Sequence, residues 1–139
     1  MAVNIQSVGV IGAGQMGNGI AHVCALAGYS VFLNDLSPDR IKAGMATING
    51  NMAKQVGKKA ITEDDRKGAL ARIKPAEKYD AMSTCDLVIE TATEKEEVKR
   101  KIFSDLCASL KSDAILATNT SSISITRLAS STDRPERFI

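Results

Sequence analysis

A glycine-rich turn directly after a short apolar run constrains this chain more than any other feature. The apolar run is Ser7–Ile11, whose β-branched residues are typical of a buried parallel strand. The turn that follows reads Gly12, Ala13, Gly14, Gln15, Met16, Gly17. In a G-x-G-x-x-G turn the glycines permit a tight bend, close approach of the backbone to a pyrophosphate, and close packing of the next helix. The turn therefore predicts a dinucleotide site, with a glycine turn that holds no ligand as the alternative.

Short apolar runs and longer amphipathic segments alternate along the rest of the chain. This alternation predicts an α/β fold, a Rossmann-type doubly wound, mainly parallel sheet with helices on both faces. The runs predict strands at 7–11, 31–33, 86–90 and 114–117, with a short edge strand near Ile73. Residues 133–137 resemble a loop and Phe138-Ile139 a strand that is just beginning. We therefore expect one domain over 1–139 that is cut from a longer protein.

Local patterns also predict how the helices begin and which faces they bury. Helix starts are predicted at Ser37-Pro38, at Thr62 and at Thr93, and one of Ser121 and Ser122 is a further candidate cap. The helix after the glycine turn is expected to bury Ile20, Val23, Cys24 and Ala27. The cluster Lys99-Arg100-Lys101 is interpreted as a solvated helix face.

Composition excludes several functional classes. A net charge of +2 in 139 residues favours neither nucleic acid nor an anionic membrane as the main partner, and no apolar stretch approaches a membrane span of about 20 residues. The first seven residues lack the basic and apolar regions of a secretion signal. The cysteines Cys24, Cys85 and Cys107 are interpreted as reduced core residues of a cytoplasmic protein. With one histidine, His22, the chain offers no metal-ligand spacing.

Asp35 follows the second predicted strand, where a carboxylate binds the adenosine ribose hydroxyls of a dinucleotide. A carboxylate there repels a ribose 2′-phosphate, so Asp35 favours NAD over NADP. Arg40 would favour NADP, but the proline-started helix is expected to turn it to solvent. A turn residue without a ligand is the alternative interpretation of Asp35.

Two further polar runs follow predicted strands and are expected at the same edge of the sheet. They are Glu90–Lys95 and Asn119–Ser122. Hydride transfer also needs an acid–base group, and His22 is predicted to be structural because its helix lies behind the glycine turn. The residues thus indicate a cofactor site without an evident catalytic base.

Three segments together resemble the N-terminal domain of the L-3-hydroxyacyl-CoA dehydrogenase family, in particular its bacterial members that act on 3-hydroxybutyryl-CoA. The segments are Val8–His22 (VGVIGAGQMGNGIAH), Asp86–Glu94 (DLVIETATE) and Ala117–Ile125 (ATNTSSISI). The resemblance covers nearly the whole chain. It implies an NAD-linked oxidation of a 3-hydroxyacyl-CoA to the 3-ketoacyl-CoA.

The resemblance also implies roles for individual residues. It assigns the turn Gly12–Gly17 to the pyrophosphate and Asp35 to the adenosine ribose. The residues assigned to the nicotinamide side are Glu90, Lys95, Asn119 and Ser121. Ser121 also matches the serine that hydrogen-bonds the substrate's 3-oxygen. Asn51 and Lys58 match positions that contact coenzyme A, and Lys54, one turn before Lys58, is a further candidate.

In the family the base is a histidine that is paired with a glutamate, in a strand that would begin where Phe138-Ile139 ends. A helical domain that forms a homodimer follows. Since these parts are missing, the resemblance implies that this chain alone is inactive. The alternative is a module that senses NAD(H) or coenzyme A without chemistry.

Overall fold

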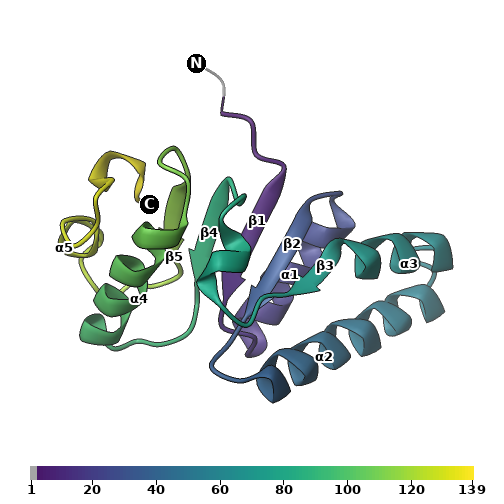
Figure 1. The fold of residues 1–139 in the computed structure, drawn as a ribbon. Coiled ribbons are helices and arrows are strands. Elements are labelled where there is room, and N and C mark those ends of the chain that lie inside the picture. The colour runs from purple at the N-terminus through teal and green to yellow at the C-terminus, as the bar shows by residue number, and fades with distance from the viewer. Residues whose placement is uncertain (1–2) are drawn as a thin grey trace.

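The computed structural model describes residues 3–139, which form a parallel sheet covered by helices (Figure 1). Met1 and Ala2 lie outside the described residues. They belong to the segment 1–7, in which the sequence predicts no secretion signal. The strands are β1 (Ser7–Ile11), β2 (Ser30–Asn34), β3 (Ile73–Pro75), β4 (Leu87–Glu90) and β5 (Ile115–Thr118). They lie in the order β3-β2-β1-β4-β5, and every pairing is parallel. The predicted fold class is therefore confirmed.

The helices connect consecutive strands or follow the last one. They are α1 (Gln15–Leu26), α2 (Pro38–Gly57), α3 (Glu63–Arg72), α4 (Glu96–Ser109) and α5 (Ile125–Ala129), with 3-10 turns η1 (Tyr79–Met82) and η2 (Pro135–Arg137). Two predicted helix starts are confirmed. Ser37 caps α2, whose first residue is Pro38, and the Ser37 hydroxyl accepts a hydrogen bond from the Arg40 N–H. Thr62 forms a capping box with Asp65 at the start of α3.

Two other predicted caps are wrong. The Thr93 hydroxyl accepts from the Lys95 N–H at 3.1 Å, which closes a local turn before the helix, and α4 begins at Glu96 without a side-chain cap. At α5 the cap is Ser124, whose hydroxyl accepts from the Arg127 N–H, and not Ser121 or Ser122. The Thr93 hydroxyl thus satisfies a neighbouring backbone group outside the helix.

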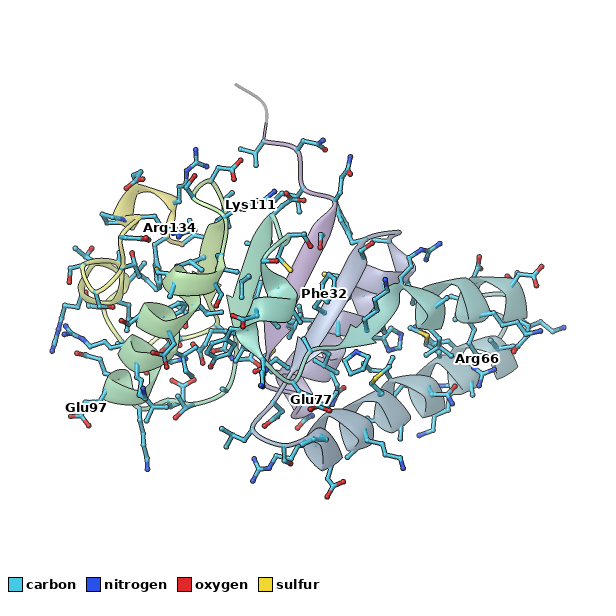
Figure 2. All side chains as sticks on the ribbon, viewed as in Figure 1. Phe32, Arg66, Glu77, Glu97, Lys111 and Arg134 are labelled. Atoms are coloured by element: carbon cyan, nitrogen blue, oxygen red, sulfur yellow. The ribbon has the colours of Figure 1, made fainter. Side chains whose placement is uncertain are left out.

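The sheet has one apolar core on each face. Helices α1, α2 and α3 cover one face over Val10 and Leu33, whereas α4, α5 and η1 cover the other over Val88 and Leu116. Figure 2 shows charged side chains such as Glu97 projecting outward. No helix among the described residues is long and apolar enough to cross a membrane.

The predicted buried face of α1 is correct only in part. Ile20 and Cys24 are half-buried and pack against the core, whereas Val23 and Ala27 are exposed. The helix packs through Gly17, Ala21 and Ala25, which recur every four residues, whereas Val23 is 61% exposed. Small residues on this stripe let the helix axis lie close to the strands, and a branched side chain at these positions would hold the helix away. Residue size, rather than hydrophobicity alone, therefore decides which face of α1 is buried.

The chain reverses its direction of winding at β1, whose neighbours are β2 on one side and β4 on the other. Ligands of such sheets bind outside the carboxyl ends of the strands at this switch point. The arrowheads of the strands mark this edge in Figure 1. Phe138 forms a parallel bridge with Leu116 of β5, so the final residues lie beside β5 in an extended conformation, as the sequence predicts.

Candidate dinucleotide site at the carboxyl edge of the sheet

The glycine turn is held between the ends of β2 and β4 by backbone hydrogen bonds. The Gly12 N–H donates to the Asn34 carbonyl at 2.9 Å, and the Thr91 N–H donates to the Ile11 carbonyl at 2.8 Å. Gly12 has a φ of +100°, which disfavours any residue with a side chain. A Cβ on Gly17 would lie 1.6 Å from the Gly12 carbonyl oxygen. Both glycines are therefore required by the turn itself.

Gly14 has a different environment from the other two glycines of the turn. A Cβ built on it would meet nothing within 4 Å. Gly14 is also the N-cap of α1, and no side chain caps the helix or places an acidic group in its first turn. The first N–H groups of α1 are thus free to bind an anion in open space, as a pyrophosphate requires.

Gly44 brings α2 against the glycine turn, a contact that the sequence analysis missed. A Cβ on Gly44 would lie 2.8 Å from both the Cβ and the carbonyl oxygen of Ala13. A glycine in a helix interior costs about 1 kcal/mol relative to alanine. Its presence in the middle of α2, next to the buried positions Ile41 and Ile48, was the available signal for a close approach.

Asp35 follows β2 and is bonded to the glycine turn. Its Oδ2 accepts from the Ala13 N–H at 2.7 Å, and its Oδ1 accepts from the Leu36 N–H at 2.6 Å. The Arg40 guanidinium lies 3.9 Å from Oδ1 while its side chain stays 66% exposed. Arg40 is therefore exposed to solvent, as expected. Its guanidinium nevertheless remains beside Asp35, which the expectation did not include.

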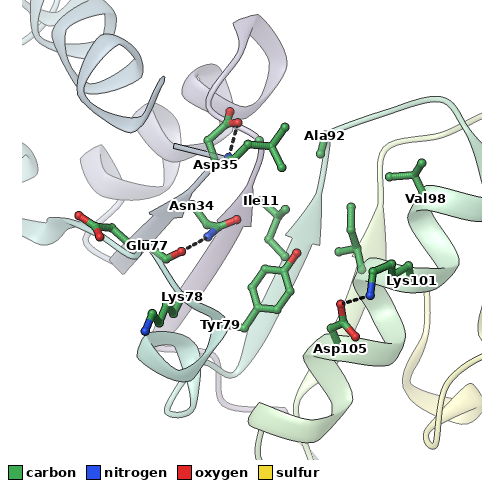
Figure 3. Close-up of a pocket in the computed structure, with 13 residues that line it drawn as sticks. Ile11, Asn34, Asp35, Glu77, Lys78, Tyr79, Ala92, Val98, Lys101 and Asp105 are labelled. Atoms are coloured by element: carbon green, nitrogen blue, oxygen red, sulfur yellow. Dashed lines mark hydrogen bonds and ion pairs between the residues drawn. The ribbon is translucent and has the colours of Figure 1, made fainter. Parts of the chain in front are cut away.

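A largely apolar cavity of about 500 Å³ opens at the ends of β1 and β2 (Figure 3). The Tyr79 ring lines it and projects between Ile11 and α4. The buried Asn34 amide shapes its rim by donating to the Ala76 carbonyl at 2.8 Å. This cavity has the size and lining of a site for a flat, apolar ring system.

A second cavity, of about 620 Å³, lies between the glycine turn and α2. Its lining is polar and includes Gln15, Asn18, Arg40, Thr47 and Asn51. We refer to the two as the apolar cavity and the polar cavity. Asp35 lines both, and no other residue between 3 and 139 does.

The ends of β4 and β5 are joined by a buried cluster of three side chains, Glu90, Lys99 and Thr118. The Lys99 ammonium lies 2.5 Å from Glu90 Oε1, and both side chains are fully buried. The Thr118 hydroxyl lies 3.0 Å from the same oxygen and 3.2 Å from the ammonium. The other oxygen of Glu90 accepts from the Ala92 N–H at 2.7 Å. Glu90 thus has a full set of protein partners at the base of the site.

Lys99 overturns the interpretation of 99–101 as a solvated helix face. It lies four residues before Phe103 and seven before Leu106, so it continues the buried stripe of α4. This spacing was the signal in the sequence. It was missed because a lysine is almost never buried without a charged partner, and the partner Glu90 lies on a different element.

The loop after β5 carries the remaining predicted residues. Within residues 3–139 the buried amide oxygen of Asn119 has no hydrogen-bond partner, so an acceptor is left available in this loop. The Thr120 hydroxyl donates to Glu94 at 3.1 Å and ties this loop to the one after β4. Ser121 is exposed, and so is Lys95 at the start of α4.

The other candidates lie on α1 and α2. His22 is 8% exposed and its Nε2 lies 2.7 Å from the Gln55 amide oxygen, so it joins α1 to α2. The coenzyme A candidates Asn51, Lys54 and Lys58 are exposed along one face of α2 and its C-cap, and Asn51 lines the polar cavity. Among the described residues no group of three His, Cys, Asp or Glu side chains is arranged to hold a metal.

Solved structures of dehydrogenases share this fold. The chain superposes on the (S)-3-hydroxybutyryl-CoA dehydrogenase of Ralstonia eutropha with a TM-score of 0.95 and 44% identity, covering 98% of this chain and 48% of that one. For the 3-hydroxybutyryl-CoA dehydrogenase of Escherichia coli the TM-score is 0.94 at 38% identity, covering 97% of this chain and 29% of that one.

Sequence comparison leads to the same group. The chain is 70% identical over all 139 residues to a 3-hydroxybutyryl-CoA dehydrogenase of Bradyrhizobium diazoefficiens, of which it spans 47%. It therefore covers about half the length of that relative. The family described as "3-hydroxyacyl-CoA dehydrogenase, NAD binding domain" matches residues 7–139. The chain belongs to the 3-hydroxyacyl-CoA dehydrogenase family, of which it is the NAD-binding domain.

Proposed function

We propose that the protein to which this domain belongs catalyses the reversible, NAD-linked oxidation of (S)-3-hydroxyacyl-CoA to 3-ketoacyl-CoA. A short acyl chain, as in 3-hydroxybutyryl-CoA, is the proposed substrate. The observation that carries the proposal is the 70% identity, over every residue, to a 3-hydroxybutyryl-CoA dehydrogenase. The polar loops that meet at the ends of β4 and β5 are consistent with it.

The residues of the crevice fit NAD from one end to the other. The apolar cavity accommodates the adenine, and the carboxylate of Asp35 faces the hydroxyls of its ribose. The open space at Gly14 and the free N–H groups of α1 suit the pyrophosphate. The unpartnered oxygen of Asn119 suits the amide N–H of the nicotinamide. When bound, NAD supplies the hydride acceptor.

The substrate is assigned to the same edge of the sheet. Ser121 is exposed beside Asn119 and donates its hydroxyl to the substrate's 3-oxygen in this proposal. Asn51, Lys54 and Lys58 contact coenzyme A, whose phosphates suit the two ammonium groups. Glu90, through its contacts with Lys99 and Thr118, holds the ends of β4 and β5 on the nicotinamide side of the site. Lys95 is exposed at the start of α4, on the same side.

The acid–base group is assigned to residues beyond this domain. His22 is engaged with Gln55 between α1 and α2, away from the ends of β4 and β5. The proposal therefore includes a histidine–glutamate pair and a helical, dimer-forming domain after residue 139. The dehydrogenases of Bradyrhizobium diazoefficiens and Ralstonia eutropha are about twice as long as this chain, which leaves room for both. The three free cysteines are consistent with a location in the cytoplasm.

The test of this proposal is an assay of the full-length protein with acetoacetyl-CoA and NADH. The decrease in NADH absorbance measures the turnover. We expect turnover, and Ser121→Ala should lower kcat by about tenfold or more because a hydrogen bond to the reacting oxygen is lost. Ser104→Ala, an exposed serine on α4, is the matched control and should leave the rate unchanged.

One outcome would contradict the proposed reaction, and another would contradict only the role of Ser121. NADH binding without turnover of any acyl-CoA would favour the alternative, a module that senses the cofactor. Turnover that is unaffected by Ser121→Ala would remove that serine from the mechanism and leave the reaction itself in place.

A further inference from the structure

A third cavity, of about 380 Å³, lies at the amino ends of the strands, opposite the edge that carries the dinucleotide site. We call it the amino-edge cavity. It is formed where β1, β2, β3 and β4 begin, together with the loop between α4 and β5. The polar side chains of its lining include Ser30, Arg72, Lys74, Thr84, Asp86 and Lys111. None of these residues has a part in the proposed reaction or in the proposed cofactor site.

The lining carries an excess of positive charge. Three cations face one carboxylate, that of Asp86, which leaves a net charge of +2. Asp86 Oδ2 accepts from the N–H groups of Gln6 and Ser7 at 2.8 Å and 3.0 Å, and Oδ1 pairs with the Lys111 ammonium (Figure 2). Lys111 and these N–H groups lower the pKa of the Asp86 carboxyl, which is therefore ionised near neutral pH and neutralises Lys111. The remaining positive charge belongs to Arg72 and Lys74.

These two cations keep donors available for a ligand. Lys74 is exposed, and within residues 3–139 its ammonium has no ion-pair partner. Arg72 ends α3, and its Nη1 donates to the Ala25 carbonyl at 2.7 Å, which anchors the guanidinium beside the end of α1. The other N–H groups of Arg72 make no hydrogen bond to any described residue, so they are free to bind an anion.

The cavity also has an apolar surface. Phe32 lies opposite Lys74 in the register of β2 and β3, so both side chains emerge on the same face of the sheet. Phe32 is half-buried and lines the cavity. A ring attached to an anion would therefore find an apolar contact next to the two cations.

The chemistry of the lining matches a phosphate group. Guanidinium and ammonium groups bind phosphate oxygens through charge-assisted hydrogen bonds, and the exposed hydroxyls of Ser30 and Thr84 are further donors. Small-molecule sites have volumes of about 300–1,000 Å³. The cavity lies at the lower end of this range, which suits a small phosphorylated molecule.

We propose that the amino-edge cavity binds a small phosphate monoester. Arg72 and Lys74 bind the phosphate oxygens, and Phe32 contacts the organic group that the phosphate carries. Asp86 limits the affinity, because its carboxylate repels the ligand and engages Lys111. This site lies at the other edge of the sheet from the dinucleotide site and does not depend on the proposed reaction.

The test titrates the isotope-labelled 139-residue chain with phenyl phosphate and, separately, with inorganic phosphate, and records the backbone amide shifts by NMR. We expect both ligands to shift the amides of Ser30, Lys74 and Thr84. Phenyl phosphate should bind several-fold more tightly than inorganic phosphate, because its ring contacts Phe32.

Variants of the lining should change the affinity for phenyl phosphate in opposite directions. Arg72→Gln and Lys74→Gln should each weaken binding by about tenfold or more, because each removes a charge-assisted hydrogen bond. Asp86→Asn should tighten binding several-fold, since it removes a repelling charge and releases Lys111. Lys67→Gln is the matched control, because Lys67 is an exposed cation of α3 that does not line the cavity, and it should leave the affinity unchanged.

Several results would overturn the proposal. They are amide shifts that are absent or confined to the glycine turn, an affinity that Lys74→Gln leaves unchanged, and an equal loss of affinity in Lys67→Gln, which would indicate a general attraction by charge. Lys74→Gln changes an exposed side chain, so the test remains decisive if Arg72→Gln does not fold. Equal affinities for phenyl phosphate and inorganic phosphate would overturn the assignment of a monoester and the role of Phe32.

Discussion

The two ends of the cofactor crevice are held in place by different physical means. The glycine turn is shaped by backbone hydrogen bonds and by the absence of side chains at Gly12 and Gly17. The other end is shaped by the buried cluster of Glu90, Lys99 and Thr118, in which charged side chains replace solvent. The turn is therefore disrupted by a side chain added at Gly12 or Gly17, whereas the cluster is disrupted when one of its buried partners is removed.

This difference has a consequence for stability. Packing at the turn is local, and a clash there is relieved by moving one helix start. The cluster joins the end of β4 to the end of β5, and an unpaired charge inside it has no route to solvent. We therefore expect the largest losses of stability at the cluster and the largest selective losses of phosphate binding at the turn.

The largest effect is expected from Lys99→Met, which leaves the Glu90 carboxylate buried without its cation. Breaking a buried pair in this way costs about 3–5 kcal/mol. Urea unfolding of the variant would measure this loss. The double variant Glu90→Gln with Lys99→Met removes both charges and should recover much of the lost stability.

Lys101→Met, an exposed lysine of the same helix, is the control and should change the free energy of unfolding by less than about 0.5 kcal/mol. If the double variant is no more stable than Lys99→Met, packing of the lysine stem rather than charge pairing explains the cluster.

Gly17→Ala is expected to lower the stability less than Lys99→Met does, but to abolish cofactor binding. The new Cβ would collide with the Gly12 carbonyl, and overpacking of this kind costs about 1–3 kcal/mol. Because the clash displaces the turn, we expect loss of binding for both NADH and ADP-ribose, measured by calorimetry. Gly19→Ala on the same helix meets nothing within 4 Å and should retain both. Normal binding by Gly17→Ala would show that the turn adapts more readily than its geometry indicates.

Thr118→Val tests the neutral member of the cluster. It removes a donor to Glu90 and an acceptor from Lys99 while keeping the side-chain shape, and we expect a loss of about 1–2 kcal/mol in urea unfolding. ADP-ribose binding should be unchanged, since its proposed site is at the other end of the crevice. A weaker affinity for ADP-ribose would mean that the two ends are coupled.

The smallest effect is expected at Asp86, at the opposite edge of the sheet. The Lys111 ammonium, with the N–H groups of Gln6 and Ser7, lowers the pKa of the Asp86 carboxyl. The stability from this shift is therefore present above the usual pKa of about 4 and is lost as pH falls through the lower, folded value. Asp86→Asn should cost less than about 1 kcal/mol near neutral pH. The difference from wild type should shrink in acid, and a constant difference would contradict this account.

The sequence predicted the sheet well because buried parallel strands are short apolar runs between turns. Strand β1 was predicted at its observed bounds, and β5 is shifted by one residue. The start of α2 was also predictable, since Ser37 and Pro38 act through local hydrogen bonding and a fixed φ. These features depend on neighbours in the sequence.

The missed features depend on contacts between distant residues. Lys99 is buried because Glu90 and Thr118 reach it from two strands, and no local rule supplies those partners. The buried face of α1 follows from how closely that helix approaches the sheet, which favours Ala21 over Val23. The ligand roles of Asp35, Asn119 and Ser121 remain predictions, although the structure brings their loops to one edge.

The edges of the sheet carry a further consequence. Strand β3 has three residues and ends in Pro75, which has no N–H to offer another strand. On the opposite edge, Leu116 and Thr118 already exchange backbone hydrogen bonds with Ile139. A foreign strand therefore finds few free partners on either side. The sheet is protected against edge-to-edge association with other copies and against aggregation by strand addition.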